Sequence, residues 1–360
     1  MAMNSPSKPL RLSVLDQSPV AAGTTAGESL QRSISLARHV DALGYHRFWM
    51  SEHHAMDLLA CTAPEIMLAR IGAETRRIRI GSGGIMLPHY TAFKVAETFR
   101  TLHALYPGRV DLGIGRAPGG GPIESLALKR DRSTQPKDDF PDQVSELLAF
   151  LRHNFPPNHP FARMWVAPDM PGSPTVWMLG SSMWSSAAAA QFSLPYAFAH
   201  FFSPINTRHA IEAYHRSFVA TEQQETSQAT IAVGVICADT QAEADHLAAS
   251  VRLLQRRIRL GDRSPVASPD VALRELKLGG EAVFGNDEGE WPRYFVGPPD
   301  RVKASLEQMT SALKIDEVIV NTITWDHEAR LHSYDLLAEA FGLTSYTAAE
   351  GLSTPAMQLI

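Results

Sequence analysis

Short apolar runs alternate with amphipathic stretches along most of this chain. The runs are rich in β-branched and aromatic residues, which is typical of strands that a parallel sheet buries on both faces. Between the runs, apolar residues recur at the three- and four-residue spacing of a helix with one buried face. The predicted strands span residues 10–16, 45–52, 78–87, 110–115, 175–179, 196–201, 231–238 and 317–322, and the predicted helices span 28–43, 92–106, 185–192, 206–220, 242–259 and 328–341, with one more beginning at Pro64.

Eight strands, each followed by a helical stretch, predict an α/β protein with the architecture of a (β/α)8 barrel. A doubly wound open sheet would show the same alternation and is the alternative. No GxGxxG motif follows the first predicted strand, which counts against that alternative. We expect one domain over residues 1–360.

Two longer stretches interrupt the alternation, at residues 156–173 and 261–299. Both contain prolines and glycines, and stretches of this length in a compact domain are usually functional loops or disordered segments. The second one precedes the last predicted strand. Because it would lie at the carboxyl face of the barrel, where barrel enzymes carry their active sites, we predict that 261–299 is a mobile lid or a disordered loop.

The composition excludes several classes of function. The 33 Lys and Arg residues against 38 Asp and Glu residues give a net charge of −5, so the basic surface that binds nucleic acid is not expected. Cys61 and Cys237 each stand alone, which predicts neither a zinc cluster nor a disulfide framework. We find no secretory leader and no run of about 18 apolar residues, and therefore expect a cytoplasmic protein without a membrane partner.

Glycines and other small residues dominate the carboxyl ends of the predicted strands. The third strand contains Ser82, Gly83 and Gly84, and the fourth ends at Gly115. Such ends allow a flat or large ligand to lie against the backbone. A metal-dependent hydrolase would instead bring carboxylates and spaced imidazoles together there, so no metal site is expected.

Two neighbouring strand ends carry groups suited to a phosphate. Gly180, Ser181 and Ser182 come directly before a predicted helix, whose N-terminal N–H groups and dipole favour an anion. Arg116 adds a planar cationic donor after the fourth strand. Taken singly, the serines could cap the helix and Arg116 could form a surface ion pair, but together they favour a phosphate site.

The second predicted strand ends in Glu52, His53 and His54. Adjacent residues of a strand point to opposite faces, so these three side chains cannot bind one metal ion. An imidazole in a partly buried pocket is a good general acid or base, and we take His53, with Glu52 beside it, as the catalytic candidate. A packed, hydrogen-bonded histidine is the alternative, and His89 and His200 are weaker candidates.

Six segments in this order resemble the bacterial luciferase-like flavin monooxygenases across nearly the whole chain, and most resemble the FMN-dependent luciferase-like oxidoreductases among them. The segments are LSVLDQSPV at 12–20, FWMSEHH at 48–54, RIGSGGIMLPHY at 79–90, GRVDLGIGRAPGG at 108–120, MLGSSMWSSAAAA at 178–190 and YFVGPPDRV at 294–302.

The resemblance implies a TIM barrel that binds flavin at its carboxyl face. It implies a cis peptide bond at Gly83–Gly84, which would form a bulge beneath the flavin ring next to Ser82, and it matches His53 to the catalytic histidine of the family. The phosphate-binding positions of the family match Arg116, Gly180, Ser181, Ser182 and Ser185, although Trp184 is bulkier than expected beside them.

The activity that the resemblance implies is a monooxygenase that uses reduced FMN and dioxygen (O2) to oxygenate a small organic substrate, such as an aldehyde or a ketone. A separate flavin reductase would supply the reduced FMN, and the protein would form a homodimer. A deazaflavin-dependent hydride-transfer enzyme and a non-catalytic flavin-binding protein are the alternatives. The aldehyde-pocket residues of luciferase have no clear match in this chain, so light emission is not implied.

Overall fold

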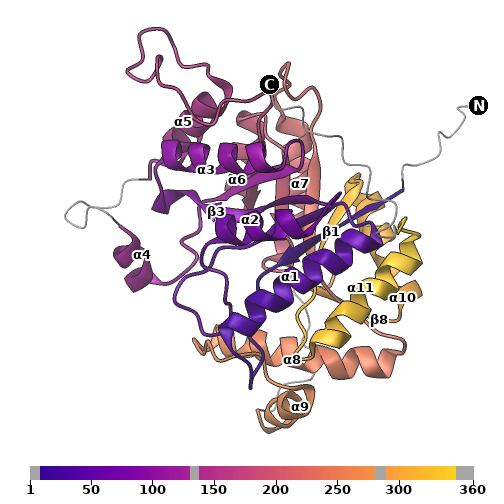
Figure 1. Cartoon of the computed structure of the whole chain (residues 1–360). Coiled ribbons are helices and arrows are strands. Elements are labelled where there is room, and N and C mark those ends of the chain that lie inside the picture. The colour runs from indigo at the N-terminus through magenta and orange to yellow at the C-terminus, as the bar shows by residue number, and fades with distance from the viewer. Residues whose placement is uncertain (1–8, 130–137, 280–288, 346–360) are drawn as a thin grey trace, which may run out of the picture.

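The computed structural model describes residues 9–129, 138–279 and 289–345, and its strands form a closed barrel (Figure 1). The strands are β1 Arg11–Asp16, β2 Arg47–Met50, β3 Arg79–Met86, β4 Val110–Gly115, β5 Thr175–Gly180, β6 Tyr196–Ala199, β7 Ala229–Cys237, β8 Tyr294–Gly297 and β9 Glu317–Asn321. Eight of them are parallel neighbours in the order β1 to β7 and then β9, which pairs back to β1. This ring confirms the (β/α)8 barrel and shows that the open-sheet alternative is wrong.

Helices surround the ring on its outer side (Figure 1). They are α1 Ala26–Leu43, α2 Pro64–Glu74, α3 Ala92–Leu105, α4 Pro122–Leu128, α5 Phe140–Arg152, α6 Met183–Gln191, α7 Thr207–Ser217, α8 Gln241–Arg259, α9 Pro269–Leu278, α10 Pro299–Leu313 and α11 His327–Phe341, with short 3₁₀ turns at Leu87–His89 and Pro204–Asn206. Local signals set many of the ends. Helix α1 begins at a capping box between Thr25 and Glu28 and ends at Gly44, whose φ of 89° suits glycine.

The sequence predicts a mobile lid or a disordered loop over residues 261–299, but this segment includes regular secondary structure. It contains α9, which packs Ala272 and Leu276 against α8, and β8, which pairs with the carboxyl half of β7 outside the ring. The short strand and the short helix give weak periodic signals among prolines and charged residues, and both were therefore missed. Residues 280–288 lie outside the described residues, and movement of this segment stays a prediction.

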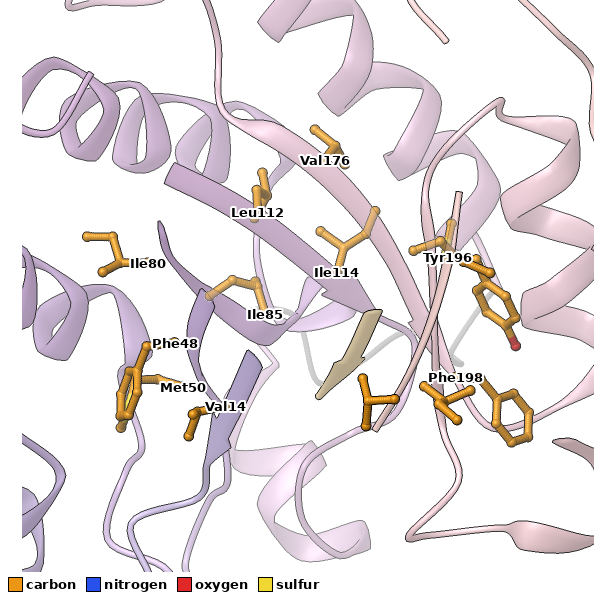
Figure 2. Packing of buried hydrophobic residues seen from close by; sticks show 14 of the residues in the cluster. Val14, Phe48, Met50, Ile80, Ile85, Leu112, Ile114, Val176, Tyr196 and Phe198 are labelled. Atoms are coloured by element: carbon orange, nitrogen blue, oxygen red, sulfur yellow. The ribbon is translucent and has the colours of Figure 1, made fainter. Parts of the chain in front are cut away.

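Two parts of the hydrophobic core lie on opposite faces of the barrel wall. The larger part lies between the strands and the helices and includes Val14, Phe48, Met50, Ile80, Ile85, Leu112, Ile114, Val176, Tyr196 and Phe198 (Figure 2). The smaller part fills the inside of the barrel with Leu15, Trp49, Trp177, Ala197, Ala232 and Ile319. Because both faces of each strand are apolar, the strands read as continuous apolar runs in the sequence.

A charged network closes the amino end of the barrel. Arg47 at the start of β2 lies 2.8 Å from Asp111 and 2.7 Å from Glu317, and all three side chains are buried. Trp49 Nε1 donates to Asp111 Oδ2 over 3.1 Å. Mutual pairing offsets the cost of burying these charges. The amino end is thus occupied by protein side chains, which leaves the carboxyl end for a ligand.

Candidate active site

A bulge at the carboxyl end of β3 forms the floor of the candidate site. The peptide bond between Gly83 and Gly84 is cis, as the resemblance implies, and the pairing of β3 with β4 shifts its register there. A Cβ atom on Gly83 would lie 2.7 Å from Leu15 Cδ1, and one on Gly84 would lie 2.8 Å from the Gly113 carbonyl oxygen. Glycine is therefore required at position 84, where the contact is with backbone, whereas a side chain at position 83 would force Leu15 to move.

Ser82 stabilises this bulge from within the sheet. Its hydroxyl donates to the carbonyl oxygen of Gly113 over 2.9 Å, and the residue has no exposed surface. The side chain therefore does not face a ligand in this conformation. The structure shows Ser82 holding the bulge, and its contact with a cofactor stays a prediction.

The loop from β5 to α6 forms a structured helix N-terminus. Ser182 is the N-cap, and its Oγ accepts a hydrogen bond from the backbone N–H of Ser185 over 3.4 Å. Ser185 is buried, and its Oγ donates to the Ser182 carbonyl and lies 2.9 Å from the Tyr196 hydroxyl. A Cβ atom on Gly180 would collide with the Ser185 side chain. Gly180 and Ser185 therefore shape the helix start, whereas Ser181 is partly exposed and Ser182 is exposed.

Arg116 lies beside the first turn of α6. Its guanidinium is 4.1 Å from the centre of the Trp184 ring, and its Nη1 is 3.2 Å from Asp138 Oδ2. The ion pair with Asp138 is exposed and therefore weak, so that a phosphate can replace it. The arrangement brings a cationic donor to a helix N-terminus, which is the chemistry of a phosphate site. No local pattern of residues indicates that Trp184 stacks on Arg116, because the two lie on separate segments of the chain.

His53 is partly buried at the end of β2. Its backbone N–H donates to the Cys61 carbonyl over 3.0 Å, and its Nδ1 lies 3.1 Å from Ser51 Oγ. Burial, with a smaller contribution from the charge of His54, lowers the pKa of His53 from 6.5 to about 4. The imidazole is therefore neutral at pH 7, where it can accept a proton but does not carry the charge of an imidazolium.

Glu52 takes part in the site indirectly. The residue has no exposed surface, and its carboxylate accepts hydrogen bonds from His54 Nε2, the Tyr90 hydroxyl and the Met86 N–H. Its side chain does not reach the surface in this conformation, and the catalytic role of Glu52 stays a prediction. Tyr90 and Met86 belong to a distant segment of the chain, around the end of β3, which is why the strand-end motif did not reveal these partners.

The two weaker histidine candidates have structural contacts. His89 Nε2 donates to the Pro118 carbonyl over 2.7 Å. His200 is fully buried, with Nδ1 2.7 Å from Thr207 Oγ1 and Nε2 3.0 Å from the Pro292 carbonyl. Both therefore hold loops in place. Within the described ranges, no group of three or more His, Cys, Asp or Glu side chains is placed to hold a metal ion.

Comparison with known proteins identifies the family. The chain matches the luciferase-like monooxygenase family over residues 10–314. It is 34% identical to the luciferase-like monooxygenase of Escherichia coli (strain K12), covering 91% of this chain and 96% of that protein. It is 33% identical to the N-acetyl-S-alkylcysteine monooxygenase of Bacillus subtilis (strain 168), covering 92% and 98%. The chain belongs to the luciferase-like monooxygenase family, which confirms the resemblance in its sequence.

Solved structures share the fold. Apo-MsnO8 is 45% identical with a TM-score of 0.85, covering 94% of this chain and 99% of its own. The oxygenating constituent of 3,6-diketocamphane monooxygenase from Pseudomonas putida, solved with FMN, is 19% identical with a TM-score of 0.70, covering 92% and 97%. An F420-dependent secondary alcohol dehydrogenase is 12% identical with a TM-score of 0.64, covering 92% and 98%. These last two likenesses concern the fold alone.

None of the helices in the described parts of the chain is long and apolar enough to cross a membrane.

Proposed function

We propose that this protein is a monooxygenase that uses reduced FMN and O2 to oxygenate a small organic substrate such as an aldehyde or a ketone. The observation that carries the proposal is the stacking of Arg116 on Trp184, which holds a guanidinium beside the first turn of α6. Membership of the family and the neighbour solved with FMN support the same cofactor.

The residues at the carboxyl end of the barrel fit FMN in charge and in shape. The N–H groups at the start of α6, the hydroxyls of Ser181 and Ser182 and the guanidinium of Arg116 are donors suited to phosphate oxygens. The backbone at Gly83 and Gly84 carries no side chains, which suits close contact with a flat ring. When bound, reduced FMN would supply the electrons for the reaction with O2.

His53 is the residue that we propose to move a proton beside the ring. Its Nδ1 is engaged by Ser51 Oγ, which leaves Nε2 to exchange a proton. The lowered pKa keeps the imidazole neutral and able to accept one at pH 7. We expect His53→Ala to bind FMN with nearly normal affinity while product yield falls, and an unchanged yield would refute the role.

The phosphate site is tested by comparing FMN with riboflavin, which lacks the phosphate. Arg116→Ala is expected to weaken FMN by about tenfold to a hundredfold and to leave riboflavin nearly unchanged, because a charge-assisted contact contributes about 1.5–3 kcal/mol. Quenching of flavin fluorescence gives both dissociation constants. Equal weakening of the two flavins would remove Arg116 from the phosphate site.

The activity itself is tested with purified protein, excess reduced FMN, labelled O2 and a substrate panel. Incorporation of one labelled oxygen atom into a product supports the monooxygenase. The panel includes thioethers as well as aldehydes and ketones, because a relative is named for its action on an S-alkylcysteine. Binding of FMN with release of peroxide alone, across the whole panel, would favour the non-catalytic flavin-binding protein.

A deazaflavin-dependent hydride-transfer enzyme is the second candidate, supported by the F420-dependent neighbour. Deazaflavins also carry a phosphate, so the contacts of Arg116 do not separate the two cofactors. Titration of the protein with each reduced cofactor distinguishes FMN from the deazaflavin. Tight binding of the deazaflavin with no binding of FMN would make the deazaflavin-dependent enzyme the favoured candidate in place of the monooxygenase.

A flavin reductase as supplier and a homodimer complete the proposal. Exposed Ile66 of α2 and Leu105 of α3 border a surface groove of about 780 Å³ on the barrel side. This apolar edge is where we expect the second copy to pack. Leu105→Glu should shift the sedimentation coefficient of a dimer to that of a monomer, and a wild-type protein that sediments as a monomer would refute the dimer.

A further inference from the structure

The carboxylate of Glu52 is engaged on both of its oxygens. Oε1 accepts hydrogen bonds from His54 Nε2 over 2.6 Å and from the Tyr90 hydroxyl over 2.8 Å. Oε2 accepts one from the Met86 N–H over 2.8 Å. Met86 ends β3 and Tyr90 precedes α3, so one fully buried side chain joins the end of β2 to the end of β3 and to the connection that follows it.

His54 extends this network to the loop after β4. Its backbone N–H donates to the Gly119 carbonyl over 2.9 Å. Gly119 has a φ of +62°, and a Cβ atom there would lie 3.2 Å from the Glu52 carbonyl oxygen and 3.6 Å from His54 Cδ2. The loop thus packs directly on the backbone of Glu52 and on the ring of His54. Arg116 lies three residues before Gly119 in the same loop.

We propose that Glu52 is a positioning residue, whose carboxylate fixes the loop that carries Arg116 relative to the strand end that carries His53. This role rests on the proposed function, in which Arg116 holds the phosphate and His53 lies beside the ring. The side chains of Glu52 and His54 are bonded to each other, whereas the side chain of His53 between them is bonded to Ser51. Glu52 can therefore hold the backbone of this segment without occupying the ligand site.

The test compares three substitutions. Glu52→Gln keeps the size of the side chain but places an amide N–H₂ against donors. Tyr90→Phe removes one donor and leaves the carboxylate in place. Tyr45→Phe is the matched control, since it removes a buried phenol that donates to the Tyr334 carbonyl over 2.8 Å away from the site. The readouts are the dissociation constants of FMN and of riboflavin, with urea unfolding to measure stability.

We expect Glu52→Gln to raise the dissociation constant of FMN about tenfold and that of riboflavin less than about twofold, because the displaced loop carries the phosphate contact. Tyr90→Phe should raise the FMN value about threefold, since it removes one hydrogen bond of the network. Tyr45→Phe should lower stability while leaving the ratio of the two constants at its wild-type value. If the ratio of the FMN dissociation constant to the riboflavin dissociation constant is the same in Glu52→Gln as in Tyr45→Phe, the positioning role is overturned.

Three further outcomes are also decisive. If Glu52→Gln does not fold, Tyr90→Phe decides, and an unchanged FMN to riboflavin ratio in that variant overturns the inference. A wild-type protein that binds neither flavin would refute the proposed function itself. A wild-type protein that prefers FMN, together with a Glu52→Gln variant that prefers it equally, would refute only the role of Glu52.

Discussion

A single carbon added at Gly180 should weaken binding of the cofactor phosphate and also lower the stability of the fold, and the two effects can be measured separately. Gly180 ends β5, and a Cβ atom built there would collide with both Cβ and Oγ of Ser185. Ser185 cannot move away easily, since it is buried and its hydroxyl is bound to the Ser182 carbonyl and to Tyr196. In Gly180→Ala the start of α6 must shift instead, and with it the N–H groups that we propose to bind the phosphate.

The structure sets the magnitude of this effect. Overpacking of a buried contact typically destabilises a protein by about 1–3 kcal/mol, and disturbing the Ser182 cap would add about 1 kcal/mol. Loss of about 1.4 kcal/mol of binding free energy weakens a ligand tenfold. Losing one N–H contact to the charged phosphate costs about 1.5–3 kcal/mol of binding free energy, so we expect Gly180→Ala to weaken FMN by about tenfold or more, with a much smaller effect on riboflavin.

Fluorescence quenching by each flavin and urea unfolding of the same samples measure the two effects. Gly27→Ala is the control, because a Cβ atom there meets only Thr25 Oγ1 at 3.9 Å within helix α1. This change should leave the dissociation constants of FMN and of riboflavin unaltered. It should keep or raise the free energy of unfolding, since alanine is the better helix former.

A double substitution provides the decisive comparison. Ser185→Gly removes the side-chain atoms that a methyl group on residue 180 would strike. Gly180→Ala combined with Ser185→Gly should therefore bind FMN no worse than Ser185→Gly alone. Additive losses in the double variant would show that the collision is not the cause. Normal FMN affinity in Gly180→Ala would refute the placement of the phosphate at this helix.

Three other predictions concern stability and reactivity. Since the pKa of His53 is about 4 in the folded protein against 6.5 ordinarily, the unfolded chain binds more protons between these values, and stability should fall as pH falls through that window. His53→Asn should reduce this slope in urea unfolding, and an identical slope would contradict it. Burial raises the pKa of Cys61 and Cys237 to about 12, so alkylation of the native thiols should be far slower than in urea, and equal rates would contradict their burial. Asp111→Asn removes one partner of buried Arg47 and should cost about 3–5 kcal/mol of unfolding free energy, and a loss under about 1 kcal/mol would contradict the buried pair.

The sequence by itself determined the barrel and the positions of several candidate groups. Apolar runs buried on both faces locate the eight strands of the ring, because a parallel sheet covered on both sides needs nearly continuous apolar residues. The resemblance located the cis bond at Gly83–Gly84, and Arg116 does lie beside the helix that follows Gly180. The strands follow from local runs of residues, and the site positions follow from short motifs that the family shares, which is why both could be predicted.

Only the tertiary structure decided what each polar side chain does. Glu52 and Ser185 have the residue types of a site, but both are buried and bonded to groups that other segments supply. Trp184, which is bulkier than the family resemblance leads one to expect, stacks on Arg116. Strand β8 lies outside the ring because β7 pairs with β9 along its first half and with β8 along its second. Accessibility and hydrogen bonding depend on contacts between segments distant in the chain, and no local pattern of residues specifies those contacts.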